Sequence, residues 1–327
     1  MSKGKLKVAV IGVGNMGRHH ARNYYEMKEC NLVAICDIDP TKAELAKQYS
    51  CAFYTDFRRM LKNEKIDAIS IAVPTKHHFA IAMHCIKDRK HVLVEKPIAA
   101  SVSDARRMIA LAAKMKVTFT VGHIERFNPG VQKMHELINQ GKLGSIISII
   151  SKRVGPFAPR IKDSGVLIDL AVHDIDIIGH LLHKLPTHVT VNGGKAINKK
   201  IDDFAEIFLR YGNQSGYIQV NWITPVIIRE LHVTGTKGYA HLNYITQELG
   251  FYKSRYKEQF NNYGDFVIQF GKSHRLNVPI QSHEPLRREL QSFLANITRH
   301  TRPVVSGQDG LEALRIALRA LHTIKYA

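Results

Sequence analysis

The chain is poor in cysteine, in acidic residues and in long hydrophobic runs. Its four cysteines lie in the first third of the 327 residues without Cys-x-x-Cys spacing, at Cys30, Cys36, Cys51 and Cys85. We therefore expect reduced thiols and no disulfide framework, and we assign no metal site. No apolar run approaches the roughly 18 residues of a membrane span, and the run over residues 8–13 is too short for a signal peptide. These absences predict a cytoplasmic protein without a membrane partner.

Acidic residues are scarce: the chain has 28 Asp and Glu but 47 Lys and Arg, which gives a formal net charge of +19. The excess positive charge is shared almost equally between residues 1–122 and residues 123–327. A nucleic-acid footprint is normally concentrated on one face or in one tail, so we expect no nucleic-acid partner. With 45% hydrophobic residues, 11 Pro and 22 Gly, the composition also excludes collagen-like and disordered chains.

The length suggests two domains, because a domain typically takes about 150 residues. In residues 1–122, short apolar runs alternate with helical patterns, which indicates βαβ units and a parallel sheet. We expect an α/β domain there. Its strands should be covered on both faces, because the runs are continuously apolar over residues 7–11, 32–36, 68–73, 91–94 and 117–121.

The pattern changes after residue 122. One strongly apolar helix is followed by alternating strand-like runs that are separated by hairpin-type turns. Two amphipathic helices near residues 285–298 and 310–324 close the chain. We therefore expect an α+β domain over residues 123–327, built on a mostly antiparallel sheet.

A glycine motif follows the first expected strand. Residues 12–17 read Gly-x-Gly-x-x-Gly between a strand and a helix, the setting in which this pattern binds a dinucleotide pyrophosphate. Asp37 follows Gly17 by 20 residues, where a carboxylate binds the ribose hydroxyls of NAD and repels the extra phosphate of NADP. Lys42 could soften that preference, and the alternative is that the glycines serve only a tight turn. The expected NAD-binding residues are Gly12, Gly14, Asn15, Met16, Gly17, Asp37, Pro74, Thr75, Glu95 and Lys96.

The tripeptide at residues 95–97, Glu-Lys-Pro, ends the fourth expected strand. With the glycine motif upstream and the run from Asp169 to His173 downstream, the chain resembles the glucose-fructose oxidoreductase and inositol dehydrogenase family (Gfo/Idh/MocA) over nearly its whole length. The resemblance implies a Rossmann domain and a C-terminal domain whose open sheet face often forms oligomer contacts, so we expect a homo-dimer or homo-tetramer. It also implies reversible oxidation of a sugar or polyol hydroxyl, with Lys96 catalytic. Taken alone, Lys96 would be a surface lysine paired with Glu95.

A polar stripe marks the helix expected over residues 167–182. Asp169, His173 and Asp176 lie at spacings of four and three on an otherwise apolar helix, and burying them needs a partner network or a polar ligand. We expect a cleft, although a structural His–Asp pair and a divalent metal site remain alternatives. His173, with an ordinary pKa near ~6.5, would take the hydroxyl proton, while Lys96 orients and polarises the substrate. Asp169 would fix the tautomer of His173.

Two polar blocks suggest the substrate. Arg126 and Asn128 lie at the expected domain junction, and Arg153 and Arg160 flank a loop with two prolines and a glycine. Arginine binds phosphate in fork geometry, so we expect these four residues, with Asp169 and His173, to bind an anionic sugar. The alternative for the junction is a hinge network.

The two blocks look like the nucleotide-sugar branch of the family, the UDP-N-acetylglucosamine 3-dehydrogenases, which implies oxidation at C3. The family often carries several glycines before the catalytic Asp, but here only Gly165 precedes it. Other hypotheses are a dehydrogenase of an unphosphorylated sugar or polyol such as inositol, and a non-catalytic, cofactor-dependent sugar sensor.

Overall fold

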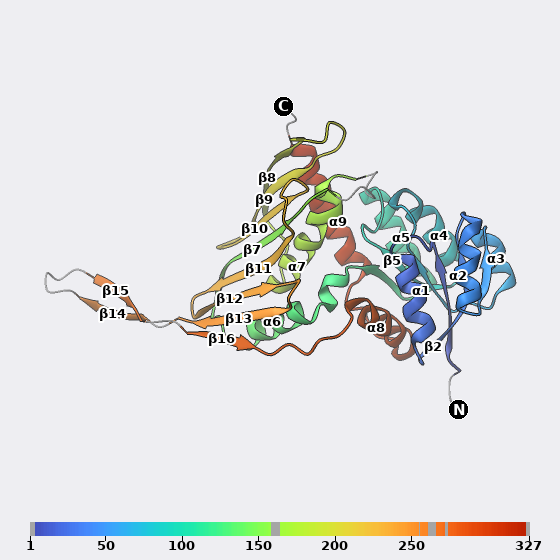
Figure 1. The fold of residues 1–327 in the computed structure, drawn as a ribbon, viewed down its shortest axis with the longest axis horizontal. Helices are drawn as coiled ribbons and strands as arrows, with labels where there is room; N and C mark the ends of the chain where they lie inside the picture. Colours follow the sequence, from blue (N-terminus) through green and yellow to red (C-terminus); the bar gives the residue numbers. More distant parts are fainter. Residues whose placement is uncertain (1–3, 158–163, 255, 261–265, 272–273, 325–327) are drawn as a thin grey trace. The chain divides into compact units, whose positions relative to one another are not determined.

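A computed structural model describes residues 4–157, 164–254, 256–260, 266–271 and 274–324. Contacts within the chain divide it into two units (Figure 1). Unit 1 comprises Met1–Phe127 and His283–Arg315, and unit 2 comprises Asn128–Ser282 and Ile316–Ala327. Among the described residues, no helix combines the length and the apolar character that a membrane crossing requires.

Unit 1 is built on a six-stranded parallel sheet in the order β3-β2-β1-β4-β5-β6. The expected parallel sheet is therefore confirmed, and its central strands are buried as their apolar runs require. The short edge strand β3 was not expected. The strands are β1 (Leu6–Ile11), β2 (Cys30–Cys36), β3 (Ala52–Tyr54), β4 (Ala68–Ile71), β5 (His91–Glu95) and β6 (Phe119–Gly122).

Helices connect and cover these strands. The α-helices of unit 1 are α1 (Gly17–Glu26), α2 (Ala43–Gln48), α3 (Phe57–Asn63), α4 (His78–Lys87), α5 (Val102–Met115) and α8 (Pro285–Arg299). Its 3₁₀ turns are η1 (Pro40–Lys42), η2 (Thr75–His77) and η3 (Ile124–Phe127). Helix α9 (Gly307–Thr323) belongs to unit 1 as far as Arg315 and to unit 2 from Ile316 onward.

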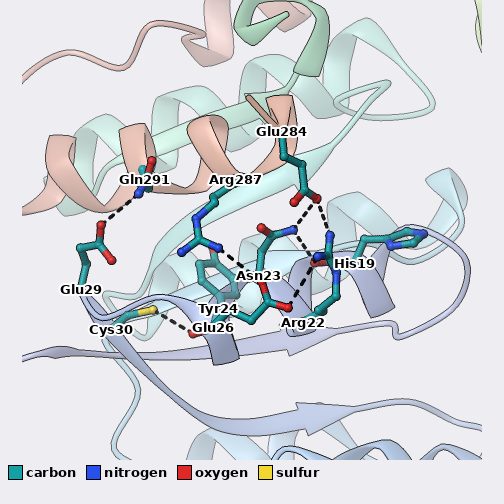
Figure 2. Close-up of polar contacts among 10 residues, drawn as sticks. All are labelled: His19, Arg22, Asn23, Tyr24, Glu26, Glu29, Cys30, Glu284, Arg287 and Gln291. Carbon is teal, nitrogen blue, oxygen red and sulfur yellow. Dashed lines mark hydrogen bonds and ion pairs between the residues drawn. The ribbon is translucent and has the colours of Figure 1, made fainter. Parts of the chain in front are cut away.

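Helix α8 lies beside α1, although its sequence lies far downstream (Figure 2). The carboxylate of Glu284 contacts Arg22 and accepts a hydrogen bond from Asn23 Nδ2 at 2.9 Å. The apolar face of α8 joins the core of the parallel sheet through Leu290 and Phe293. The division into residues 1–122 and 123–327 therefore needs a correction: residues 283–315 belong with the first unit, because this amphipathic helix buries its apolar side against α1.

Unit 2 is built on an eight-stranded sheet in the order β16-β13-β12-β11-β7-β10-β9-β8. Only β7 and β10 pair in parallel among its neighbours, so the expected mostly antiparallel sheet is confirmed. Strands β14 (Tyr256–Phe260) and β15 (Phe266–Phe270) form a separate antiparallel pair. The large sheet contains β7 (Ile146–Val154), β8 (His188–Gly194), β9 (Phe204–Tyr211), β10 (Gln214–Asn221), β11 (Ile228–Gly235), β12 (Gly238–Asn243), β13 (Glu248–Lys253) and β16 (Arg275–Val278).

Helices α6 (Pro129–Asn139) and α7 (Val172–Leu182) pack against this sheet, with a π-helical turn η4 (Leu167–Ala171) directly before α7. Along β10, β11 and β12, buried residues alternate with half-buried ones. One face of these strands therefore packs on the helices, and the other carries more polar side chains.

Candidate active site

The expected cofactor residues gather at one edge of the parallel sheet. Strands β1, β2, β4 and β5 run in the same direction, so their carboxyl ends share this edge. Ligands of open α/β sheets bind outside these ends, at the point where the strand order reverses, and here that point lies between β1 and β4. The residues that follow these strand ends are the glycine loop 12–17, Asp37, Pro74 with Thr75, and Lys96.

The glycine loop fits a pyrophosphate. Gly12 has φ +83°, and a Cβ there would lie 2.6 Å from Val73 Cγ1. A Cβ on Gly17 would lie 1.7 Å from the carbonyl oxygen of Gly12, so α1 can begin so close to the loop only with glycine at this position. Gly14 is exposed, and nothing lies within 4 Å of where its Cβ would be. The loop therefore packs tightly at Gly12 and Gly17 and leaves open space at Gly14.

Asp37 anchors this loop. Its Oδ2 accepts a hydrogen bond from the backbone N–H of Val13 at 2.8 Å, and its Oδ1 accepts one from Asp39 N–H at 3.0 Å. Each carboxylate oxygen has a second lone pair, so both can also accept from ribose hydroxyls. Lys42 Nζ lies 3.6 Å from Asp39 Oδ2.

A buried acid–histidine network lies behind Lys96, which is half-buried. Glu95 Oε2 accepts a hydrogen bond from the Lys96 backbone N–H at 3.2 Å, and Glu95 Oε1 lies 2.9 Å from His20 Nε2. Burial by itself would raise the pKa of Glu95, but the hydrogen bond from His20 and the charges of His20 and Lys96 bring that pKa below its ordinary value.

Glu289 on α8 adds a second carboxyl to this network. It is buried, and neither of its carboxyl oxygens has a hydrogen-bond partner within the described part of the chain. Burial and the negative charge of Glu95 raise the pKa of Glu289 well above its ordinary value. The pKa values of these two buried carboxyls therefore lie on opposite sides of the ordinary value for glutamate.

His78 ties two of the loops together, although the sequence analysis did not include it among the site residues. Its Nδ1 lies 2.9 Å from the carbonyl oxygen of Pro97, and its Nε2 lies 2.9 Å from that of Val73. The ring therefore joins the segment after β4 to the segment after β5, where the Lys96–Pro97 peptide bond is cis.

In unit 2, Asp169 and His173 are both half-buried. Asp169 lies in the π-helical turn η4 and His173 in the first turn of α7, so the expected continuous α-helix over residues 167–182 was wrong in its first turn. Asp202 holds this start, because its Oδ2 accepts from the Leu167 backbone N–H at 3.2 Å. A Cβ on Gly165 would lie 1.9 Å from Asp202 Oδ1, so the single glycine before the helix admits this carboxylate.

Arg153 lies in the interior of unit 2, where its guanidinium binds Asp174. Its Nε donates to Asp174 Oδ2 at 3.0 Å, and its Nη2 donates to Asp174 Oδ1 at 3.1 Å. Ser151 Oγ donates to the same carboxylate at 2.7 Å, and Asp174 is fully buried. The pair holds α7 against β7, which gives Arg153 a role in packing that the sequence analysis had not foreseen. Asp174 itself was missed, because helical spacing drew attention to Asp176.

Arg126 and Asn128 also bind within the protein. Arg126 Nη1 donates to the Val304 carbonyl at 3.1 Å, and its Nη2 lies 3.2 Å from Asp309 Oδ1. Asn128 caps α6 by accepting from the backbone N–H groups of Gly130 and Val131. Arg160 lies outside the described residues. Among the residues that the structure describes, the arginines expected to bind phosphate therefore bind groups of the protein itself.

Two family models match the chain. Residues 6–123 match the model described as "Oxidoreductase family, NAD-binding Rossmann fold", and residues 131–241 match the GFO/IDH/MocA C-terminal domain. UDP-N-acetylglucosamine 3-dehydrogenase of Acidithiobacillus ferrooxidans is 27% identical over 318 residues, which cover 97% of this chain and 95% of that protein. Myo-inositol 2-dehydrogenase of Thermotoga maritima is 23% identical over 337 residues, covering 98% and 96%.

The fold agrees with these matches. A solved structure of the Acidithiobacillus ferrooxidans enzyme superimposes with a TM-score of 0.86 at 24% identity, and the alignment covers 98% of each chain. The open space at Gly14 and the carboxylate at the end of β2 fit the dinucleotide that the family model names. The chain belongs to the GFO/IDH/MocA family of oxidoreductases and has its NAD-binding Rossmann fold.

Proposed function

We propose that the protein oxidises a secondary hydroxyl of a nucleotide sugar with NAD, at C3 of UDP-N-acetylglucosamine. The observation that carries the proposal is the edge of the parallel sheet, where Lys96 follows β5 and the dinucleotide loop follows β1, with β4 between the two strands. The nucleotide sugar is supported by the similarity to the Acidithiobacillus ferrooxidans enzyme, which extends over 97% of this chain.

Four groups divide the chemistry in this proposal. NAD, held by the glycine loop and Asp37, supplies the acceptor for the hydride that leaves the carbinol carbon. His173 takes the hydroxyl proton, and Lys96 donates a hydrogen bond that orients and polarises the same oxygen. Asp169 orients the imidazole of His173 and stabilises its protonated form.

A dehydrogenase of an uncharged polyol is the second candidate. Two observations favour it: an inositol dehydrogenase is similar over 98% of this chain, and Arg126 and Arg153 each bind a carboxylate of the protein. Either substrate would leave the roles of Lys96, Asp169 and His173 unchanged.

The deciding experiment mixes the purified chain with NAD and, separately, UDP-N-acetylglucosamine, other UDP-sugars, free N-acetylglucosamine and myo-inositol. Formation of reduced cofactor is followed by absorbance, and the keto product is trapped to locate the carbonyl. Addition of a 2-oxo acid shows whether bound cofactor is reoxidised in place. Turnover with myo-inositol and not with UDP-N-acetylglucosamine would replace the first candidate by the second. Turnover with none of them would favour a sugar-sensing protein.

Variants test the roles. We expect Lys96→Met and His173→Asn each to lower kcat at least a hundredfold, because general acid–base and orienting groups contribute about that much or more. His180→Asn, which changes another histidine of α7, is the matched control. Near-normal turnover of Lys96→Met, or an unchanged pH profile of His173→Asn, would remove the corresponding role.

A further inference from the structure

Three side chains capable of binding a metal lie together in the large sheet of unit 2. Glu230 and His232 are two residues apart on β11, so they point to the same face. His241 on β12 pairs directly with His232 in the antiparallel register. All three are half-buried, whereas their strand neighbours Leu231, Ala240 and Leu242 are buried, so the three lie on the face opposite to the packed core.

Their ligand atoms converge. Glu230 Oε2 lies 3.3 Å from His232 Nε2, and Glu230 Oε1 lies 3.7 Å from His241 Nε2. The two imidazole rings stack with centroids 4.4 Å apart and an interplanar angle of 13°. One ligand atom from each of the three residues lies within 4.8 Å of the other two.

His241 Nε2 is shielded from solvent and accepts or donates no hydrogen bond within the described part of the chain. A buried ring nitrogen without such a bond is costly, and a metal ion would satisfy it. The carboxylate of Glu230 lies beside this atom and supplies the negative charge that a divalent cation requires.

Tyr239 contacts the second ring nitrogen of His232. Its hydroxyl oxygen lies 2.6 Å from His232 Nδ1. Histidine ligands of metals normally donate their second N–H to an oxygen, which fixes the tautomer. The ligand atom of His232 would then be Nε2, which lies 3.3 Å from Glu230 Oε2.

We propose that Glu230, His232 and His241 form a binding site for one divalent transition-metal ion of the Zn²⁺ type. Two imidazoles and one carboxylate suit Zn²⁺, Ni²⁺ or Cu²⁺ better than Mg²⁺ or Ca²⁺, which prefer oxygen ligands. Ligand atoms at about 2.0–2.1 Å from Zn²⁺ lie roughly 3.3 Å apart in a tetrahedron, so small side-chain rotations would complete the site. Three protein ligands leave a fourth position for water or an added ligand.

A second group of histidines has to be separated from this site in any test. His135 on α6 and His183 after α7 place their Nε2 atoms 3.2 Å apart, and the ring of His180 lies 4.5 Å from that of His135. Among the described residues, the sheet cluster is the group that brings three such ligand atoms within 4.8 Å of one another. The second group of histidines therefore supplies the control variant.

The test uses the full chain, without an affinity tag and stripped of metal by a chelator. Isothermal titration with Zn²⁺ gives stoichiometry and affinity, and visible absorption of Co²⁺ reports the ligand set. We expect one site whose affinity falls at least a hundredfold in His241→Gln and in Glu230→Gln. Tyr239→Phe should weaken binding about ten- to hundredfold, as expected for loss of an outer hydrogen bond. Thermal unfolding without metal verifies that each variant is folded.

His183→Gln should leave this Zn²⁺ site unchanged. The proposal is overturned if the stripped protein binds no Zn²⁺ stoichiometrically, or if His183→Gln abolishes binding while His241→Gln and Glu230→Gln retain it. Loss in all three variants also counts against it, because the sheet cluster and the histidines of α6 and α7 would then not act independently. The result does not depend on turnover, so it stands or falls separately from the proposed oxidation.

Discussion

The carboxylate of Asp37 does two things at the end of β2. It holds the glycine loop through Val13 N–H, and we propose that its lone pairs and negative charge bind the adenosine ribose of NAD. Asparagine at this position would keep one oxygen that can accept from Val13 but would remove the charge and the acceptor for Asp39 N–H. The two tasks can therefore be separated by substitution.

We predict that Asp37→Asn changes cofactor preference with little effect on the fold. The KM for NAD should rise about tenfold or more, because hydrogen bonds to a charged group are worth about 1.5–3 kcal/mol. The KM for NADP should fall, because its 2′-phosphate no longer meets a carboxylate. Steady-state kinetics with both cofactors measure this. Asp37→Ala, which also releases Val13 N–H, is the comparison, and equal NAD and NADP kinetics in the unmodified protein would contradict the assignment.

Glu289 makes the stability of the protein depend on pH. Its pKa is raised in the folded chain, whereas in the unfolded chain a glutamate ionises above about pH 4.3. The contribution of Glu289 to the free energy of unfolding is therefore largest below that pH. It is lost as the pH rises toward the pKa that Glu289 has in the folded chain. Glu289→Gln removes the effect, so its stability relative to the unmodified protein should increase by up to about 1.4 kcal/mol per pH unit above pH 5.

Urea unfolding between about pH 5 and pH 8 measures this difference. Glu44→Gln, which changes an exposed glutamate of α2, is the control for loss of one carboxyl. If the stability difference between Glu289→Gln and the unmodified protein were the same at every pH, the pKa of Glu289 would not be raised in the folded chain.

At the scale of elements, one buried ion pair fixes the helix that carries His173. Arg153 on β7 donates hydrogen bonds from Nε and Nη2 to Asp174 on α7, and Ser151 Oγ donates another to the same carboxylate. Removing one partner of a buried pair leaves the other charge without compensation. The pair therefore matters more to stability than the exposed ion pairs of unit 1.

We predict that Asp174→Asn lowers the free energy of unfolding by about 3–5 kcal/mol. Glu44→Gln, which breaks an exposed pair with Lys47, should change it by less than about 1 kcal/mol. The double variant Asp174→Leu with Arg153→Met should recover part of the loss, since no buried charge remains. Denaturant unfolding measures all three, and a loss below about 1 kcal/mol in Asp174→Asn would show that water reaches the pair.

Local sequence patterns predicted helices and strands better than they predicted which distant residues contact them. Continuous apolar runs predicted β1, β2, β4, β5 and β6, but the half-buried edge strand β3 has only three residues and gave no such pattern. The turn at Gly165 could not be predicted, because Asp202 shapes it from 37 positions farther along the chain.

The same limit applies to the candidate site. The glycine loop and Asp37 could be predicted as cofactor residues because they follow strand ends in a fixed order. Arg153 was taken for a phosphate ligand because a Pro- and Gly-rich loop follows it. Its partner Asp174 lies 21 residues away on another element, and no local pattern connects the two.

At the scale of the whole molecule, unit 1 is built from two distant stretches of sequence. Leu286, Leu290 and Phe293 of α8 belong to the same core cluster as Val8 and Val10 of β1. Residues 1–127 alone would expose this apolar surface. We therefore expect cofactor binding by unit 1 to require α8.

We predict that a chain ending at residue 282 binds NAD at least a hundredfold more weakly and no longer unfolds cooperatively. Each missing core residue corresponds to about 2–5 kcal/mol when it is reduced to alanine, so the loss of several exceeds the stability of a typical domain. Calorimetric titration with NAD and thermal unfolding measure the two effects. Addition of a peptide spanning residues 283–315 should restore binding in part, and full NAD affinity without it would contradict the prediction.

The order of the chain has a consequence for biosynthesis. A ribosome adds about 5–20 residues per second, so β1 leaves the exit tunnel many seconds before α8 is translated. During that interval the apolar surface of α1 and β1 that α8 later covers stays available to chaperones. We expect nascent chains halted before residue 285 to remain bound by these factors, and those halted well after residue 315 to be released.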